Sequence, residues 1–395
     1  MVCPAGDGRC GDRCAGVSAG WEWAGGASSS TVAEWGLVCG ERYKVGLAQS
    51  AFFVGSMIGA GVFGHLSDSF LGRKGPLQVA CVLSAAFGLL TALSPNYWAY
   101  AALRLLTGFS AGSVAVLSFC LATEPIGPSR RGTAGISSYY FFSAGIAACS
   151  GLAALFPASW RVLYVVTSLP SLLYDVTLKL DGEDVEKQSS ASIVDVLQSP
   201  TTRTLLVLSV LLNFLCSVVY YGLSLNVVNL KTNLYVSVLL NSVADLPACL
   251  LITLLLNRFG RKPLCIGLML LGGVACTAGS LIAGISVMMV MIRMACGVVG
   301  IFGVGATYIL LFVYTAELFP TVVRNVALGF ATQATQVGAI VAPLVVMLGE
   351  RVPFAVFGAS AIMGTLLVSY LPETMNKPMY DTMAGLEEGE RSLLK

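Results

Sequence analysis

Two short segments of the chain place an acid and a base seven residues apart where an apolar run ends. Glu124 and Arg131 lie in ATEPIGPSRRG, and Glu317 and Arg324 lie in VYTAELFPTVVRN. Charges at helix ends can form ion pairs that hold one conformation and break in another, as a gate requires. The simpler interpretation is solvation of helix ends on the cytoplasmic side of a membrane. A glutamate at the same place in both segments favours the gate, because topology alone does not require it.

The gate hypothesis extends to two polar turns. GHLSDSFLGRKGP carries Asp68 and Arg73, and LLLNRFGRKPL carries Arg261. The second turn has Asn257 where the first has Asp68, and the first turn has one extra residue, so the charge pattern is not fully repeated.

Ionisable side chains within apolar runs are candidates for a substrate path, since a charge at the bilayer centre costs about 2.5–3.5 kcal/mol on insertion scales. Asp245 lies about 18 Å along a helix from the nearest polar turn. Arg104 and Arg293 occupy matching places in LRLLTG and IRMACG, nearer the opposite face. The alternative for all three is buried pairing between helices.

Uncharged polar and aromatic side chains extend this set. Tyr220, with Asn213 on a nearby helical face, is expected to line a central cavity, where an aromatic ring attracts cations. Tyrosine is also common at membrane interfaces, so packing is the alternative interpretation. Gln49, next to Phe52 and Phe53, is a weaker candidate of the same kind.

The composition indicates what positions these residues. Charged residues make up 11% of the chain and hydrophobic residues 56%, with a mean hydropathy of +0.80. A soluble domain has about 25% charged residues, so the chain is expected to be an all-α polytopic membrane protein. A net charge of +2 gives no argument for a nucleic-acid partner. We find no phosphate-binding loop, metal cluster or nucleophile–base pair, and therefore expect no cofactor, no ATP-driven pump and no enzyme.

The apolar windows predict eleven membrane-spanning helices, five before a polar stretch at about 180–203 and six after it. The expected spans are 45–63, 76–94, 97–122, 134–156, 160–178, 204–225, 232–256, 264–284, 287–313, 327–348 and 353–371. Basic residues gather in alternate loops, which places the 64–75 loop and the C-terminus on the cytoplasmic side. The expected regions are an outer segment (1–44), a first bundle (45–178), a cytoplasmic loop (179–203), a second bundle (204–374) and a cytoplasmic tail (375–395).

The four cysteines of the outer segment are Cys3, Cys10, Cys14 and Cys39. Their even number favours disulfides in an extracellular loop, with the pairing left open. A zinc site is the alternative, which the absence of histidine and of a paired CxxC motif disfavours.

The chain contains an internal repeat. The two Gly-Arg-Lys turns, the pair Arg104 and Arg293, and the two Glu-x6-Arg segments recur in the same order. Glu124 and Glu317 are 193 residues apart, and Arg73 and Arg261 are 188 apart. Three ordered matches at nearly one offset predict a duplicated helical bundle.

These motifs resemble those of the major facilitator superfamily, whose transporters are built from two six-helix halves. AVLSFCLATEPIGPSRRG, YTAELFPTVVRN and LPETMNKPMYDT are most similar to the family of organic cation, anion and carnitine transporters, and especially to its plant members. The resemblance implies a two-bundle fold and alternating access. The repeat itself calls for a helix before Tyr43 that corresponds to 204–225, and no apolar run lies there, so we expect helix 1 of the twelve to be missing. The resemblance implies a longer central loop, most of which we also expect to be missing. About eleven helices (five and six) remain.

The resemblance bears on the substrate through Gln336, which lies in ATQATQVGAIVAP. Cation-selective relatives tend to carry aspartate there and anion-selective relatives arginine. A neutral amide enforces neither sign, so a carnitine-like zwitterion or an organic cation becomes the expected substrate.

We therefore predict a secondary transporter of such small organic ions, embedded in the lipid bilayer of the plasma membrane or, second, the vacuolar membrane. The alternative is a truncated membrane protein that does not transport and that modulates, or only associates with, a full-length relative.

Overall fold

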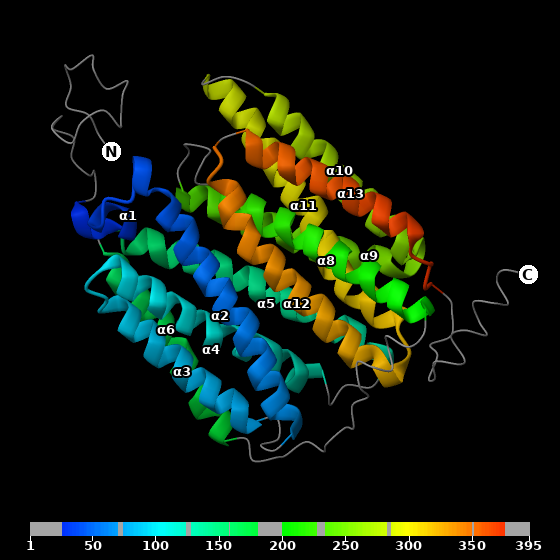
Figure 1. Ribbon diagram of the computed structural model, residues 1–395, viewed down its shortest axis with the longest axis horizontal. Helices are drawn as coiled ribbons and strands as arrows, with labels where there is room; N and C mark the ends of the chain where they lie inside the picture. Colours follow the sequence, from blue (N-terminus) through cyan, green and yellow to red (C-terminus); the bar gives the residue numbers. More distant parts are fainter. Residues whose placement is uncertain are drawn as a thin grey trace, which may run out of the picture.

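The computed structural model describes residues 26–69, 74–123, 128–157, 159–180, 200–226, 234–282, 286–349 and 351–375, and this part of the chain is helical (Figure 1). Before the long helices lie η1 (Ala27–Ser29), α1 (Thr31–Glu34) and η2 (Cys39–Glu41). The long helices are α2 (Tyr43–Ser69), α3 (Lys74–Ala92), α4 (Tyr97–Thr123), α5 (Pro128–Leu155), α6 (Trp160–Leu180), α8 (Pro200–Asn226), α9 (Leu234–Phe259), α10 (Arg261–Leu281), α11 (Val287–Leu318), α12 (Thr321–Val346) and α13 (Val352–Tyr370).

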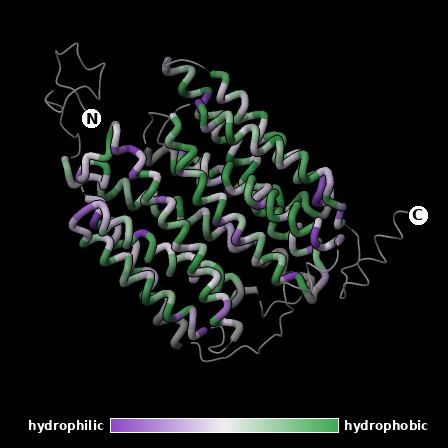
Figure 2. The backbone as a smooth tube through the Cα atoms, in the orientation of Figure 1, coloured by the Kyte–Doolittle hydropathy of each residue, from purple (hydrophilic) through white to green (hydrophobic). Residues whose placement is uncertain are grey.

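The predicted class, an all-α polytopic membrane protein, is confirmed. Within the described residues, ten helices are long and apolar enough to cross a membrane, and α6 contributes a shorter apolar stretch, Trp160–Leu173. Figure 2 shows hydrophobic residues along the whole length of most helices. Helices α2, α5 and α12 extend about six residues past the predicted spans at one end, because an apolar window measures only the hydrocarbon core while the helix continues into the polar boundary.

The helices pack as two related sets. In the first set α2 packs along α4, and α3 packs against α4 and α6. In the second set α9 packs along α11, and α10 packs against α11 and α13. The pairs correspond one to one, as expected for a duplicated bundle. We refer to α2–α6 as the first half and to α8–α13 as the second half.

Among the described residues, the two halves meet mainly where α2 lies against α12 (Figure 1) and where α5 lies against α9. The Ser50 hydroxyl of α2 donates to the Ile340 carbonyl of α12 at 2.8 Å. Phe53 of α2 meets Tyr221 of α8 with ring centroids 5.0 Å apart. This contact between the halves is aromatic.

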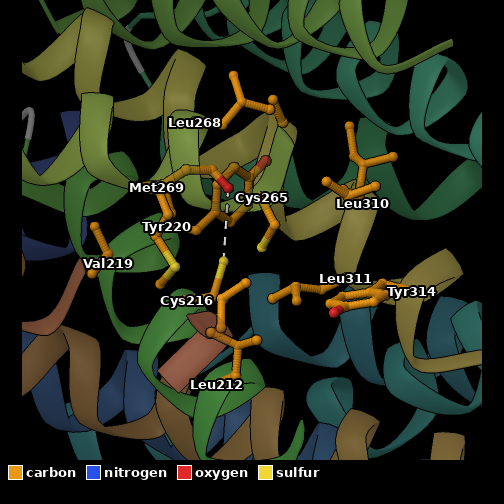
Figure 3. Close-up of a cluster of buried hydrophobic side chains, with 14 of the residues drawn as sticks. Leu212, Cys216, Val219, Tyr220, Cys265, Leu268, Met269, Leu310, Leu311 and Tyr314 are labelled. Carbon is orange, nitrogen blue, oxygen red and sulfur yellow. Dashed lines mark hydrogen bonds between the residues drawn. The ribbon is translucent and has the colours of Figure 1, made fainter. Parts of the chain in front are cut away.

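The second half has a continuous core built around α8, which packs against α11, α12 and α13. Figure 3 shows part of it, with Leu212 and Cys216 of α8 facing Met269 of α10 and Leu311 of α11. In the described residues of the first half, buried apolar side chains form two smaller clusters instead.

The first half relies on close backbone contact between α2 and α4. A Cβ added at Gly55 would overlap the Leu105 carbonyl oxygen, and one at Gly59 would overlap the Phe109 carbonyl oxygen. Small residues allow helices to approach closely in lipid, where apolar burial alone gives no preference for helix–helix contact. These glycines therefore set the distance between the two helices.

The turn from α9 to α10 is built on Gly260, whose φ of 81° is one that favours glycine. The Glu373 carboxylate accepts hydrogen bonds from the backbone N–H groups of Arg261 and Lys262, each at 3.0 Å, and so satisfies the start of α10. The Gly-Arg-Lys turn identified in the repeat thus needs a glycine because its backbone adopts a positive φ at that position.

Candidate functional site

A buried carboxylate lies where α8, α9 and α11 meet. The Tyr220 hydroxyl of α8 donates to Asp245 Oδ2 of α9 at 2.9 Å. The Asp245 side chain is 6% exposed, and its Oδ1 has no hydrogen-bond partner in the described structure. An unpaired buried acceptor of this kind is costly, so it is a natural place for a cationic group to bind.

The neighbouring helix is shaped to hold this pair. A Cβ added at Gly305 of α11 would lie 2.8 Å from Asp245 Oδ1 and 3.3 Å from the Tyr220 ring. A larger residue would therefore displace the carboxylate. Two residues after Asp245, Pro247 removes a backbone N–H from α9 and leaves a carbonyl without its helical donor.

Aromatic rings surround the carboxylate. Tyr308 of α11 stacks on Tyr220 with centroids 5.0 Å apart and an interplanar angle of 18°. Tyr221 and Tyr139 meet Tyr308 edge-on, each at 6.2 Å. We call Tyr139, Tyr220, Tyr221, Tyr308 and Asp245 the tyrosine–aspartate cluster.

Ring faces and one carboxylate are the combination that recognises quaternary ammonium and other organic cations. Tyr139 comes from α5 of the first half, and Phe53 of α2 meets Tyr221 from the same side. The cluster thus draws on both halves, and a relative movement of the halves would change its access.

Asn213 of α8 and Gln336 of α12 were both predicted as cavity residues, and their contacts differ. Asn213 is buried and donates to the Ser209 carbonyl at 2.8 Å and to the Thr315 hydroxyl at 3.4 Å, so its amide group links α8 to α11. The Oε1 of Gln336 is buried with no partner in the described structure. No hydrogen bond among the described residues joins either side chain to Asp245.

The predicted arginines occupy different settings. Arg104 donates to Gln49 Oε1 at 2.7 Å, and its Cζ lies 4.9 Å from the centre of the Phe52 ring. Arg293 is 3% exposed and donates to the Ile282 carbonyl, at the end of α10, at 2.8 Å. Gln49 and Arg104 belong together, whereas Arg293 fastens the end of a neighbouring helix.

A group of polar and charged side chains around Glu317 joins α10, α11 and the segment after α13. Arg261 of α10 makes a two-bond ion pair with Glu317 of α11, with both N···O distances 2.8 Å. The Thr374 hydroxyl also donates to Glu317, at 2.7 Å. Burial would raise the pKa of Glu373, but hydrogen bonds from four backbone N–H groups outweigh it and hold the pKa below its usual range. The carboxylate therefore stays ionised at neutral pH.

The remaining predicted gate residue of the second half is Arg324, which donates to the Phe319 carbonyl at 3.5 Å. The Glu317–Arg261 pair lies within the second half, so it fixes helices of one half to each other. A gating role for it stays a prediction.

Several predicted residues fall outside the description. Asp68, Arg131 and Cys39 belong to described helices, but their side chains are not described. Arg73, Glu124, Cys3, Cys10 and Cys14 lie outside the described residues altogether.

Sequence reasoning missed Tyr308 as a member of the site. The available signal was a tyrosine near the middle of an apolar helix of 32 residues, far from either interface where tyrosine is common.

This chain is similar to known proteins along most of its length. Residues 26–343 match the model of the Major Facilitator Superfamily. Organic cation/carnitine transporter 4 of Arabidopsis thaliana is 51% identical over 94% of this chain and 79% of its own length. An organic cation transporter protein of Drosophila melanogaster is 32% identical over 92% of this chain and 74% of its own length.

Among solved structures, the xylose transporter of E. coli in an inward-open conformation superposes with a TM-score of 0.69 at 19% identity, over 89% of this chain and 90% of that one. At this identity the likeness establishes the two-bundle fold alone. The sequence relatives add the family, and so this chain, a multi-pass membrane transporter, belongs to the organic cation/carnitine transporter family of the major facilitator superfamily.

Proposed function

We propose that the chain is a secondary carrier of organic cations and carnitine-like zwitterions, which bind at the tyrosine–aspartate cluster. The observation that carries the proposal is the buried Asp245 with one oxygen unpaired beside stacked tyrosine rings. The names of the relatives, organic cation and carnitine transporters, support the same substrate class.

Alternating access follows from how the halves meet. The α2–α12 and α5–α9 contacts are the boundary on which two bundles, residues 45–178 and 204–374, would rock. The Arg261–Glu317 pair keeps the second bundle rigid during this movement, because it ties α10 to α11. The site opens to one side and then the other, and we place the carrier in the plasma membrane.

The test is uptake of labelled tetraethylammonium and carnitine by cells that express residues 1–395. Asp245→Asn keeps the volume but removes the charge, and should lower kcat/KM about 10- to 100-fold, as expected for loss of a charge-assisted contact worth about 1.5–3 kcal/mol. The matched control is Ser56→Ala, 189 residues earlier on α2, which should change uptake by less than about fivefold because a small hydroxyl contributes about 1 kcal/mol or less.

Two results would contradict the proposal. Wild-type uptake at background level, with surface expression confirmed by biotinylation, would contradict a carrier that acts alone. Co-purification with a longer relative in that case would favour the alternative, a non-transporting partner. Undiminished uptake by Asp245→Asn would instead reject this cluster as the cation site.

A further inference from the structure

Arg104 is a charged side chain within a membrane span for which the described structure supplies no acid. Its Nη2 donates to the Gln49 amide oxygen at 2.7 Å, and its Nε is buried without a partner. Its other close neighbours are the ring of Phe52 at 4.9 Å and the ring of Tyr164 at 6.0 Å. Neither a neutral amide nor a ring face neutralises a guanidinium.

Other described arginines are compensated differently. Arg161 pairs with Glu34 at 2.6 Å, and Arg261 pairs with Glu317 at 2.8 Å. A charge in a membrane span is expensive unless it is paired, so Arg104 has an unused capacity for an anion.

The groups around Arg104 suit a carboxylate. A guanidinium can present two parallel N–H groups to the two oxygens of a carboxylate, and such bonds are stronger than neutral ones. Gln49 offers its oxygen to Arg104, which leaves the amide NH₂ as a second donor on the same side. The Tyr164 ring lies 6.0 Å from Arg104 Cζ, and the Tyr164 hydroxyl is 3.0 Å from that of Tyr100.

Contacts between rings connect this place with the tyrosine–aspartate cluster. Phe52, under Arg104, meets Phe53 at 5.5 Å, and Phe53 meets Tyr221 at 5.0 Å. Arg104 is seven residues, about 10 Å, from the start of α4, and Asp245 is eleven residues, about 16 Å, from the start of α9. Both helices start on the predicted outer side, so the arginine lies nearer that face than the aspartate does.

We propose that Arg104 and Gln49 form an anion-binding subsite for the carboxylate of a zwitterionic substrate whose cationic group binds near Asp245. The inference rests on the proposed function and narrows it. Among organic cations, the carrier should favour those that also bear a carboxylate.

Choline and glycine betaine test the subsite, because both have a trimethylammonium group and only betaine has a carboxylate. Equilibrium binding of each labelled ligand is measured on the purified 395-residue chain, alongside uptake in cells. Arg104→Gln should weaken betaine binding at least tenfold and choline binding less than twofold. Arg104→Lys should recover part of the betaine affinity, since it restores the charge without the planar fork. Gln49→Leu should act in the same direction as Arg104→Gln, with a smaller change.

Choline binding also reports folding, so a variant that retains it is correctly assembled. The matched control is Arg293→Gln, which should affect both ligands alike. Equal loss of both ligands in Arg104→Gln would overturn the subsite, as would unchanged betaine binding in that variant or no betaine binding by the wild-type chain. Betaine binding that depends on Arg104 without any uptake would support the subsite and contradict the proposed carrier function.

Discussion

The two halves of the molecule share one pattern of helix contacts but differ at their centres. In the second half α8 lies between α11, α12 and α13, and 61% of the residues in its apolar window are buried. The described residues of the first half have no helix in the corresponding place beside α4, α5 and α6. The effect is seen on α5, where 11% of the window is buried, against 44% in α12, its counterpart in the repeat.

The first half is held together in other ways. Glycines bring the backbones of α2 and α4 into contact, and the segment before α2 packs through Trp35 onto the N-terminal ends of α4 and α6. The ring of Trp35 lies 5.1 Å from that of Tyr100 and 5.5 Å from that of Trp160. A duplicated sequence pattern therefore does not imply duplicated packing.

The candidate site also differs from the corresponding place in the first half. In the second half Asp245 faces Gly305. In the first half Ser56, 189 residues before Asp245, faces Gly112, 193 residues before Gly305. The glycine is present in both halves, but in the first half the helices close around a serine. The first half thus has a short polar side chain where the second half has a carboxylate on the same framework, which is why the proposed function assigns cation binding to the second half.

The largest effect is expected from Gly59→Ala, which tests whether glycine contact holds the first half together. A Cβ there would overlap the Phe109 carbonyl oxygen, so α2 and α4 must separate at a cost of about 1–3 kcal/mol. In the second half the corresponding position is Ala248, which is fully buried without strain. The measurement is the thermal midpoint of the purified protein in detergent. Gly61→Ala on the same helix is the control, since its nearest neighbour would be 3.7 Å away, and a midpoint lowered equally by both changes would refute the explanation.

A smaller and opposite pair of effects is expected at two glycines 193 residues apart. A Cβ at Gly338 of α12 would lie 2.6 Å from the Phe214 carbonyl oxygen of α8, whereas a Cβ at Gly145 of α5 would meet nothing within 4 Å. Gly338→Ala should lower the thermal midpoint. Gly145→Ala should raise it slightly, because alanine favours a helix by about 0.5–1 kcal/mol over glycine. Equal destabilisation by both changes would mean that a helix does lie against Gly145, and the difference between the halves would disappear.

The sequence predicted the helices, the repeat and the family because these depend on local apolar windows and on short motifs. The contacts of the site were less accessible. Glu317, Arg324 and Arg261 were predicted together as gate residues, but the sequence did not indicate which acid meets which base. In the structure Glu317 accepts two bonds from Arg261, 56 residues earlier on another helix. Tyr308 joins the candidate site only because α11 packs beside α8. Such pairs depend on tertiary packing, which the spacing of residues along one segment does not encode.

The smallest effect concerns how the outer segment is attached to the first half. Glu34 accepts hydrogen bonds from Trp160 at 2.7 Å and from Arg161 at 2.6 Å. Burial would raise the pKa of Glu34, but these bonds and the charge of Arg161 outweigh it and lower the pKa below 4.5. A carboxyl whose pKa is lowered in the folded state stabilises that state above the unfolded pKa and loses this contribution as the pH falls through the folded pKa.

The attachment should therefore be intact at neutral pH and weaken below about pH 4.5, with a change in tryptophan fluorescence as Trp160 loses its acceptor. Glu34→Gln should remove this pH dependence, because an amide does not titrate, while Glu373→Gln, at the far end of the second half, should leave it unchanged. The transition should be small, since Arg161 also donates to the Ala92 and Ser94 carbonyls and keeps those bonds when Glu34 is protonated. A fluorescence transition that persists in Glu34→Gln would show that another titrating group causes it. The absence of any transition in the wild-type protein would show that ring packing around Trp35 holds the outer segment without Glu34, and the first half would then depend on ring packing where the second half depends on α8.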